Sequence, residues 1–111
     1  MEISQLGDDR VKVTFTGRLD TPGVDRVETR FVAAVVSSGR HALVDLSQVE
    51  FIGSLGVRMF ISVARSLGRK NARLFLISPQ TQVREIFDQV SLGDIIPICL
   101  DEAEAHSALG A

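Results

Sequence analysis

The sequence predicts one α/β domain over residues 1–111, built on a largely parallel β-sheet. Strand-like and helix-like segments alternate along the chain, which is the order that gives parallel strands joined by helical crossovers. A length of 111 residues suits one hydrophobic core and is too short for two. No repeat, low-complexity tract or linker rich in Pro, Gly and Ser interrupts the chain, so we place no domain boundary.

Two strands and a turn are expected at the N-terminal end. Apolar and polar residues alternate over residues 11–16, the period of two that suits a half-buried strand. Residues 3–6 are expected to pair with this strand as a hairpin through residues 7–9. Residues 17–20, Gly-Arg-Leu-Asp, are then expected to turn the chain.

A first helix is expected to start at Thr21, because Pro22 at the first helical position gives up no hydrogen bond that a helix needs. Asp20 stands just before it, where a carboxylate commonly caps a helix or forms a turn. Gly39 is expected to end the helix. One face is apolar at helical spacing and comprises Val24, Val27, Phe31, Ala34 and Val35.

The middle of the chain predicts two buried strands with a helix between them. Residues 42–46 and 74–77 are short apolar runs, typical of central strands buried on both faces. Residues 47–50 are expected to return the chain after the first strand, with Asp45 in a turn near the strand end. Residues 55–69 have the length and periodicity of a second helix.

The C-terminal third predicts a helix, an edge strand and a closing helix. The helix follows Pro79, and residues 95–99 are expected to form a strand at a sheet edge, because Pro97 lacks an N–H donor. Residues 101–109 are expected to close the domain as a short helix capped by its first aspartate. The apolar face of the helix after Pro79 comprises Val83, Ile86, Phe87 and Val90.

Composition excludes several classes of protein. The formal net charge is −2 and no basic block occurs, which argues against a nucleic-acid binder. No apolar run approaches the roughly 20 residues of a membrane helix, so we expect no direct membrane insertion. Cys99 is the one cysteine, and residues 1–5 lack the pattern of a signal peptide, so we expect a cytoplasmic location.

Catalytic and metal-binding motifs are missing from the sequence. Residues 53–56, Gly-Ser-Leu-Gly, fall one residue short of a nucleophile elbow. His41 and His106 are expected to be exposed residues near element ends, and with one Cys they give no zinc spacing. We therefore predict neither an enzyme nor a metal or cofactor site. A basic cluster around the end of the second helix is interpreted as a solvated helix cap, and comprises Arg65, Arg69, Lys70 and Arg73.

The junction before the second helix is the candidate functional site. Ser54 follows Gly53 at the expected helix start, where a serine N-cap contributes about 1 kcal/mol. The same helix terminus would accommodate a phosphate on Ser54, because its N–H groups and positive dipole end favour an anion. Capping and phosphorylation are both open from residue type alone.

The second helix carries more apolar residues than one face is expected to bury. Leu55, Met59 and Val63 form a line away from the main apolar arc, and we interpret it as a docking surface that begins beside Ser54. The alternative is that Met59 and Val63 lie at the margin of the core. The predicted partner-binding residues are Gly53, Ser54, Leu55, Gly56, Arg58, Met59, Ser62 and Val63.

The order of elements, together with residues 17–20, residues 44–52 and the Ser54/Gly56 junction, resembles the STAS family of bacterial anti-sigma factor antagonists. The resemblance implies a four-to-five-stranded mixed sheet covered by about four helices. It implies an antagonist that binds an anti-sigma factor, or a related ATPase-fold serine kinase, in a partner-switching pathway. It also implies that the kinase phosphorylates Ser54 and that a serine phosphatase restores it.

Two residues depart from the family's junction, Asp-Ser-Ser/Thr-Gly. Gly53 stands where the family has an acidic residue, and Leu55 where it has a second hydroxyl residue. A constitutive STAS binding module that is never phosphorylated is therefore one alternative. The others are a STAS accessory subunit of a membrane lipid or solute transport system, and a small-molecule binding domain that uses a groove near Ser54.

Overall fold

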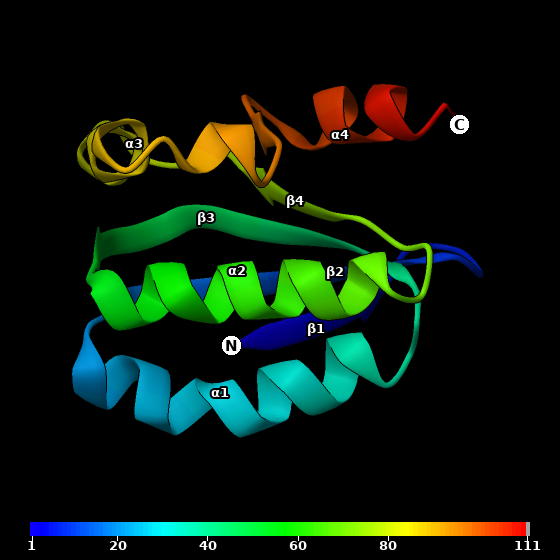
Figure 1. The fold of residues 1–111 in the computed structure, drawn as a ribbon, viewed down its shortest axis with the longest axis horizontal. Coiled ribbons are helices and arrows are strands. Elements are labelled where there is room, and N and C mark those ends of the chain that lie inside the picture. The colour runs from blue at the N-terminus through cyan, green and yellow to red at the C-terminus, as the bar shows by residue number, and fades with distance from the viewer. Residues whose placement is uncertain (111) are drawn as a thin grey trace.

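The computed structural model describes residues 1–110 and confirms an α/β fold with a five-stranded mixed sheet and four helices (Figure 1). A short 3-10 helix, η1, lies between α3 and β5. In chain order the elements are β1 (Glu2–Gln5), β2 (Arg10–Leu19), α1 (Thr21–Val36), β3 (His41–Ile52), α2 (Ser54–Gly68), β4 (Leu74–Ile77), α3 (Thr81–Gln89), η1 (Leu92–Asp94), β5 (Ile98–Cys99) and α4 (Glu102–Leu109).

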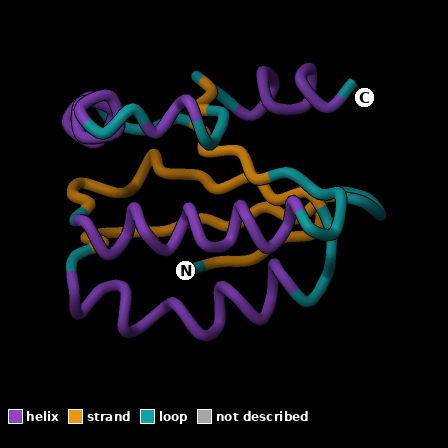
Figure 2. Tube along the Cα trace, in the orientation of Figure 1, coloured by secondary structure: helices purple, strands orange, loops and turns teal. Residues whose placement is uncertain are grey.

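The strands are ordered β1-β2-β3-β4-β5 across the sheet. The β1–β2 hairpin is antiparallel and the other three pairs are parallel, as the alternation of elements predicts. Helices α1 and α2 lie side by side on one face of the sheet (Figures 1 and 2). Helix α4 packs on β3, β4 and β5. Helix α2 begins directly after β3, so its start lies at the edge of the sheet where the paired strands β2 and β3 end.

Hydrophobic residues form one large cluster and one small cluster, on opposite faces of the sheet. In the large cluster Phe15, Phe31 and Phe60 bring β2, α1 and α2 together, with ring centroids 5.1 to 6.0 Å apart. Aromatic pairs at this separation add about 0.5–1.5 kcal/mol to the effect of burial. The small cluster lies under α4 and comprises Leu43, Phe75, Ile77, Cys99 and Ala105.

Strands β2 and β3 are longer than the sequence predicts, and the expected turns at residues 17–20 and 47–50 are wrong. From Thr14 to Arg18 the two strands stay paired, but β3 uses one extra residue at each of two register shifts. Each shift is a β-bulge, which interrupts the alternation of side chains without ending the strand. Gly17 takes a φ of +90° at the second irregularity, where glycine carries no steric cost. The broken alternation accounts for the false turns.

The C-terminal elements match the sequence in order and differ in their bounds. The strand expected over residues 95–99 is only Ile98–Cys99, because the chain first forms η1 and then passes Pro97. Val90 lies beyond the last turn of α3 and is 54% exposed, so its place on the apolar face is wrong. Helix α4 starts as predicted, with the Asp101 carboxylate accepting a hydrogen bond from the Glu104 N–H at 2.9 Å.

Candidate functional site

The candidate site is the junction between β3 and α2. The Gly53 N–H donates to the Leu19 carbonyl at 3.0 Å, which ties the junction to the end of β2. Gly53 has extended backbone angles and is the N-cap of α2, so the prediction that Ser54 is the N-cap is wrong. Ser54 is the first residue of the helix instead. Since glycine has no side chain to accept a hydrogen bond, the first turn of α2 has no side-chain cap.

The Ser54 side chain is exposed to solvent. Its hydroxyl makes no hydrogen bond to another side chain or to the backbone within residues 1–110. An exposed hydroxyl at the positive end of a helix dipole is accessible to a modifying enzyme and placed where a phosphate is favoured. The geometry is therefore compatible with the predicted phosphorylation site.

Gly56 sets how closely α2 approaches the sheet. A Cβ atom at this position would lie 2.7 Å from Ile52 Cγ1 and 3.1 Å from the Leu19 carbonyl oxygen. The glycine therefore lets the first turn of α2 lie directly against the ends of β2 and β3. Gly53 is different, because a Cβ there would meet its nearest neighbour, a Phe51 ring atom, at an ordinary 3.6 Å. A Cβ atom at position 53 therefore makes no close contact.

Arg18 covers the β3 side of the junction. Its guanidinium carbon lies 4.4 Å from the centroid of the Phe51 ring, and its Nε lies 3.3 Å from a carboxylate oxygen of Asp20. The other Asp20 oxygen accepts from the Gly23 N–H at 2.9 Å and caps α1, as predicted. The Gly23 N–H, aided by Arg18, lowers the pKa of Asp20 below its ordinary value. Sequence reasoning missed the contact between Arg18 and Phe51.

The predicted partner-binding residues separate into exposed and buried groups. Ser54, Arg58 and Ser62 are exposed. Met59 and Val63 are only 2% and 1% exposed, so the prediction that they line a surface is wrong. Helix α1 packs beside α2 and covers the side that the sheet leaves open, which buries a wider arc of the helix. Gly56 is also buried, and Gly53 and Leu55 are half-buried.

A groove of about 330 Å³ runs between α1 and α2. The half-buried Leu55 contributes apolar surface to it, the buried Met59 lies at its floor, and Ser62 lies farther along α2. Its α1 wall carries Asp25 and Glu28, while Arg58 lies on the α2 wall. The groove thus begins near Ser54 and is acidic on one side.

The solvent-facing side of α2 carries three arginines, which we call the arginine stripe: Arg58, Arg65 and Arg69. None of the three forms an ion pair within the described chain. Two other cations of the predicted basic cluster do have structural contacts. Lys70 donates to the Val36 carbonyl at 2.7 Å, and the Arg73 guanidinium lies 4.8 Å from the centroid of the Phe75 ring. The cluster is therefore not one uniform solvated cap.

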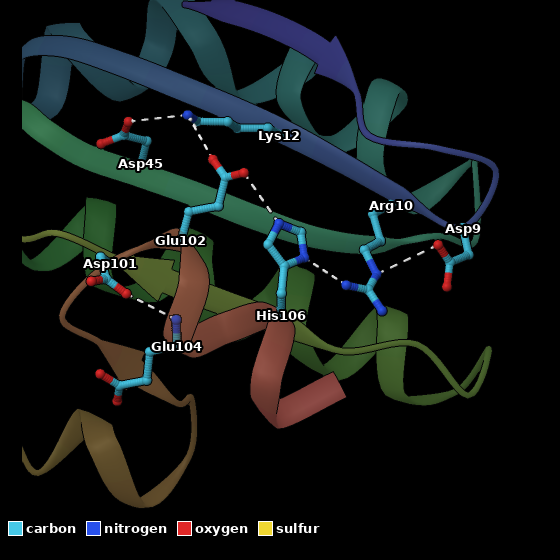
Figure 3. A network of polar contacts seen from close by, with 8 residues as sticks. All are labelled: Asp9, Arg10, Lys12, Asp45, Asp101, Glu102, Glu104 and His106. Atoms are coloured by element: carbon cyan, nitrogen blue, oxygen red, sulfur yellow. Dashed lines mark hydrogen bonds and ion pairs between the residues drawn. The ribbon is translucent and has the colours of Figure 1, made fainter. Parts of the chain in front are cut away.

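A polar network fixes α4 against the sheet (Figure 3). Arg10 donates to His106 Nδ1, so the proton of the neutral ring sits on Nε2 and is donated to Glu102 at 3.1 Å. The other Glu102 oxygen lies 2.9 Å from Lys12 Nζ, which also lies 3.7 Å from Asp45. The prediction that His106 is an exposed residue is wrong, since its half-buried ring connects Arg10 on β2 with Glu102 on α4.

The network shifts the pKa values of two of its members. Hydrogen bonds from Lys12 and then from His106 lower the pKa of Glu102 below its ordinary value. The hydrogen bond to Glu102 is the largest of several effects that raise the pKa of Lys12. Asp45 also accepts from the Ser47 N–H at 2.9 Å, which supports the backbone at the first β-bulge. This contact resembles the turn role predicted for Asp45, although the strand continues past it.

Among residues 1–110, no group of three or more His, Cys, Asp or Glu side chains is arranged to hold a metal ion. No helix in this part of the chain combines the length and hydrophobicity needed to cross a membrane. Burial raises the pKa of the Cys99 thiol, which disfavours the reactive thiolate.

Comparison with known proteins identifies similar domains. The family model described as "STAS domain" matches residues 2–105. An anti-sigma-B factor antagonist of Listeria monocytogenes is 25% identical over 106 residues, which cover 96% of this chain and 93% of that protein. A crystal structure of an anti-sigma factor antagonist from Mycobacterium paratuberculosis has a TM-score of 0.87 at 21% identity, covering 99% of this chain and 92% of that one. The phosphorylated form of Bacillus SpoIIAA has a TM-score of 0.71 at 20% identity, with 97% of each chain covered.

Proposed function

The chain belongs to the STAS domain family, and on that premise we propose that it is an anti-sigma factor antagonist acting in a partner-switching pathway. The observation that carries the proposal is the alignment with a named antagonist over 96% of the chain. In this role the protein is a binding module in the cytoplasm, and its partner is an anti-sigma factor or a related ATPase-fold serine kinase.

The docking site we propose is the exposed part of the start of α2. Ser54 and Arg58 project from successive turns, and the half-buried Leu55 supplies apolar surface at the mouth of the groove between α1 and α2. A rigid helix held against the sheet by Gly56 presents these groups in a fixed geometry. Preorganisation of this kind lowers the entropic cost of binding.

Phosphorylation of Ser54 is proposed as the switch that ends binding. A phosphate adds about −1.5 to −2 charges at pH 7, and its desolvation would weaken a contact with apolar surface. Arg58 lies one helical turn after Ser54 and is exposed, so it is placed to pair with that phosphate. The uncapped N–H groups of the first turn support the same anion.

The test combines the protein with a candidate serine-kinase anti-sigma factor and ATP, and follows complex formation by gel filtration and phosphorylation by intact mass. We expect a complex with the unmodified protein, and one phosphate on wild type that is lost in Ser54→Ala. Ser62→Ala is the matched control, since it removes another exposed serine two turns along α2. Absence of both complex and phosphate with wild type would contradict the proposal.

A complex without any change in mass would instead identify a constitutive binder. Gly53 favours that outcome, because it removes the acidic residue that precedes the phosphorylated serine in the family's junction. The transport-subunit alternative stays a prediction, and co-purification with a membrane-associated ATPase would support it.

A further inference from the structure

The arginine stripe forms a single cationic line along the outer side of α2. At about 100° per residue, Arg58, Arg65 and Arg69 fall within an arc of roughly 40°. All three side chains are exposed. They share this side of the helix with Ser54, so the stripe begins one turn after the candidate phosphorylation site and continues to the end of the helix.

No acidic residue of α2 itself compensates the charge of the stripe. Arg65 and Arg69 are an i, i+4 pair of like charges, which destabilises a helix by about 0.2–0.5 kcal/mol. The helix dipole favours them near the C-terminus of α2, but it disfavours Arg58 near the N-terminus. No Asp or Glu occurs anywhere between Glu50 and Glu85. An Asp or Glu four positions from one of these arginines would stabilise the helix by about 0.2–0.5 kcal/mol, and α2 has none.

We propose that the arginine stripe docks on an acidic surface of the partner protein. This rests on the proposed function, and it extends the contact from Ser54 along the whole length of α2. The partner's surface must therefore present carboxylates along roughly 16 Å, the rise over the eleven residue steps from Arg58 to Arg69 at about 1.5 Å per step. Charge complementarity of this kind raises the association rate and fixes the docking orientation.

The stripe is narrow because carboxylates lie on both sides of it, and this favours a protein partner over a nucleic acid or a lipid surface. Asp25 and Glu28 line the groove on the α1 side of the helix. On the other side, Asp94 lines a second groove together with Ala64 and Arg73. A nucleic acid or an anionic membrane presents negative charge over a broad area and would meet these carboxylates, whereas a narrow acidic ridge would not.

The first test uses a synthetic acidic peptide of alternating Glu and Leu residues as the probe, titrated into ¹⁵N-labelled protein. We expect shifts of amide signals over residues 58–69, and about tenfold weaker binding when NaCl is raised from 50 to 500 mM, because exposed charges are screened. Arg65→Gln/Arg69→Gln should abolish most of the shift. The matched control is Arg26→Gln/Arg30→Gln, which removes an exposed i, i+4 arginine pair from α1.

Three results would overturn the proposal: no shifts over residues 58–69, an equal loss with the α1 control, or tighter binding to duplex DNA or to phosphatidylserine vesicles than to the peptide.

The second test measures the complex with the anti-sigma factor. If the inference holds, Arg65→Gln/Arg69→Gln weakens the complex about tenfold, and the α1 control leaves it unchanged. A complex that is insensitive to Arg65→Gln/Arg69→Gln overturns the inference and leaves the proposed function standing. The reverse result is also informative. If the peptide binds at the stripe but no complex with the anti-sigma factor forms at any salt concentration, binding of the stripe to an acidic surface is supported and the proposed partner is wrong.

Discussion

Helices α2 and α4 both bury apolar side chains against the sheet, but they differ in how far polar contacts hold them in place. Helix α4 has eight residues, is capped by Asp101 at one end and by Gly110 at the other, and is held by hydrogen bonds and ion pairs. Helix α2 has 15 residues, a glycine N-cap without a side-chain bond, and outer arginines that form no ion pair within residues 1–110. Its stability comes from an apolar side that is buried against both α1 and the sheet.

The difference shows which helix is free to bind. The polar groups of α4 are engaged within the chain, so a partner that used them would first have to break existing contacts. The polar groups of α2 make few internal contacts, and burial of its apolar side keeps the helix in place without them. The predictions below test this contrast, beginning with the largest expected effect.

The largest effect is expected where α2 depends on close packing. Gly56→Ala places a methyl group 2.7 Å from Ile52 Cγ1, so the helix must shift away from the sheet, at a cost of about 1–3 kcal/mol of unfolding free energy. The measurement is urea denaturation followed by circular dichroism. Gly68→Ala is the control on the same helix, because its Cβ has no neighbour within 4 Å, and it should gain about 0.5–1 kcal/mol. Equal effects of the two variants would contradict the role of Gly56.

The second effect concerns the N-cap of α4. Asp101→Ala removes the acceptor for the Glu104 N–H and is expected to cost about 1 kcal/mol. Amide hydrogen exchange should show the loss of protection within residues 102–109 before any loss in α2. Asp101→Asn keeps an oxygen acceptor and should retain most of the stability. If Asp101→Ala were silent, α4 would not depend on its cap.

The third effect is a pH dependence that arises from the polar network between β2 and α4. The folded-state pKa of Glu102 is lowered. The contribution of Glu102 to the free energy of unfolding is therefore present above the ordinary pKa of 4.5 and is lost as the pH falls through the folded-state pKa. The folded-state pKa of Lys12 is raised, so its contribution to stability is lost as the pH rises above 10.5.

Glu102→Gln should remove a few tenths of a kcal/mol of stability near pH 7, the usual contribution of an exposed ion pair, and should flatten the dependence of stability on acid pH. Unfolding midpoints of the two proteins from pH 3 to pH 8 measure this, and parallel curves would exclude the network as the cause.

The smallest effect is expected from giving α2 the cap that it lacks. Position 53 has extended backbone angles, and a Cβ atom there makes no close contact, so Gly53→Asp should add a hydrogen bond to the first turn and a few tenths of a kcal/mol of stability. Gly53→Ala is the control and should not gain stability, because it offers no acceptor. Thermal unfolding of the two variants distinguishes cap formation from a general effect of replacing glycine. A gain in both would show that backbone entropy, and not a cap, is responsible.

The fold was largely predictable from local patterns. The start of α1 follows from Pro22 and Asp20, and the start of α4 from Asp101, because each cap acts on residues at most three positions away. The errors come from interactions that join distant parts of the chain. Met59 is buried because α1 provides a second wall for α2, and helical periodicity alone does not reveal which neighbours a helix has.

The candidate site was predicted in position but not in detail. Ser54 was recognised from its place after a buried strand, yet its role as a cap was wrong, because Gly53 already occupies the N-cap position. His106 contacts Arg10 across 96 positions of sequence, so no local pattern indicates it. The arginine stripe did leave a sequence signal, since the stretch between Glu50 and Glu85 has no acidic residue.

The two β-bulges in β3 have a consequence for insertions and deletions near the site. Side chains alternate between the faces of a sheet with a period of two, so each bulge inverts the parity of the following residues and the second bulge restores it. Deleting one residue from positions 47–51 would turn Ile52 out of the core and rotate the start of α2 away from Leu19. Deleting two residues would keep the parity and draw Ser54 back by about 7 Å along the strand. The position of the serine is thus determined by a count of residues, and a sequence alignment of this segment is meaningful only if it preserves that count.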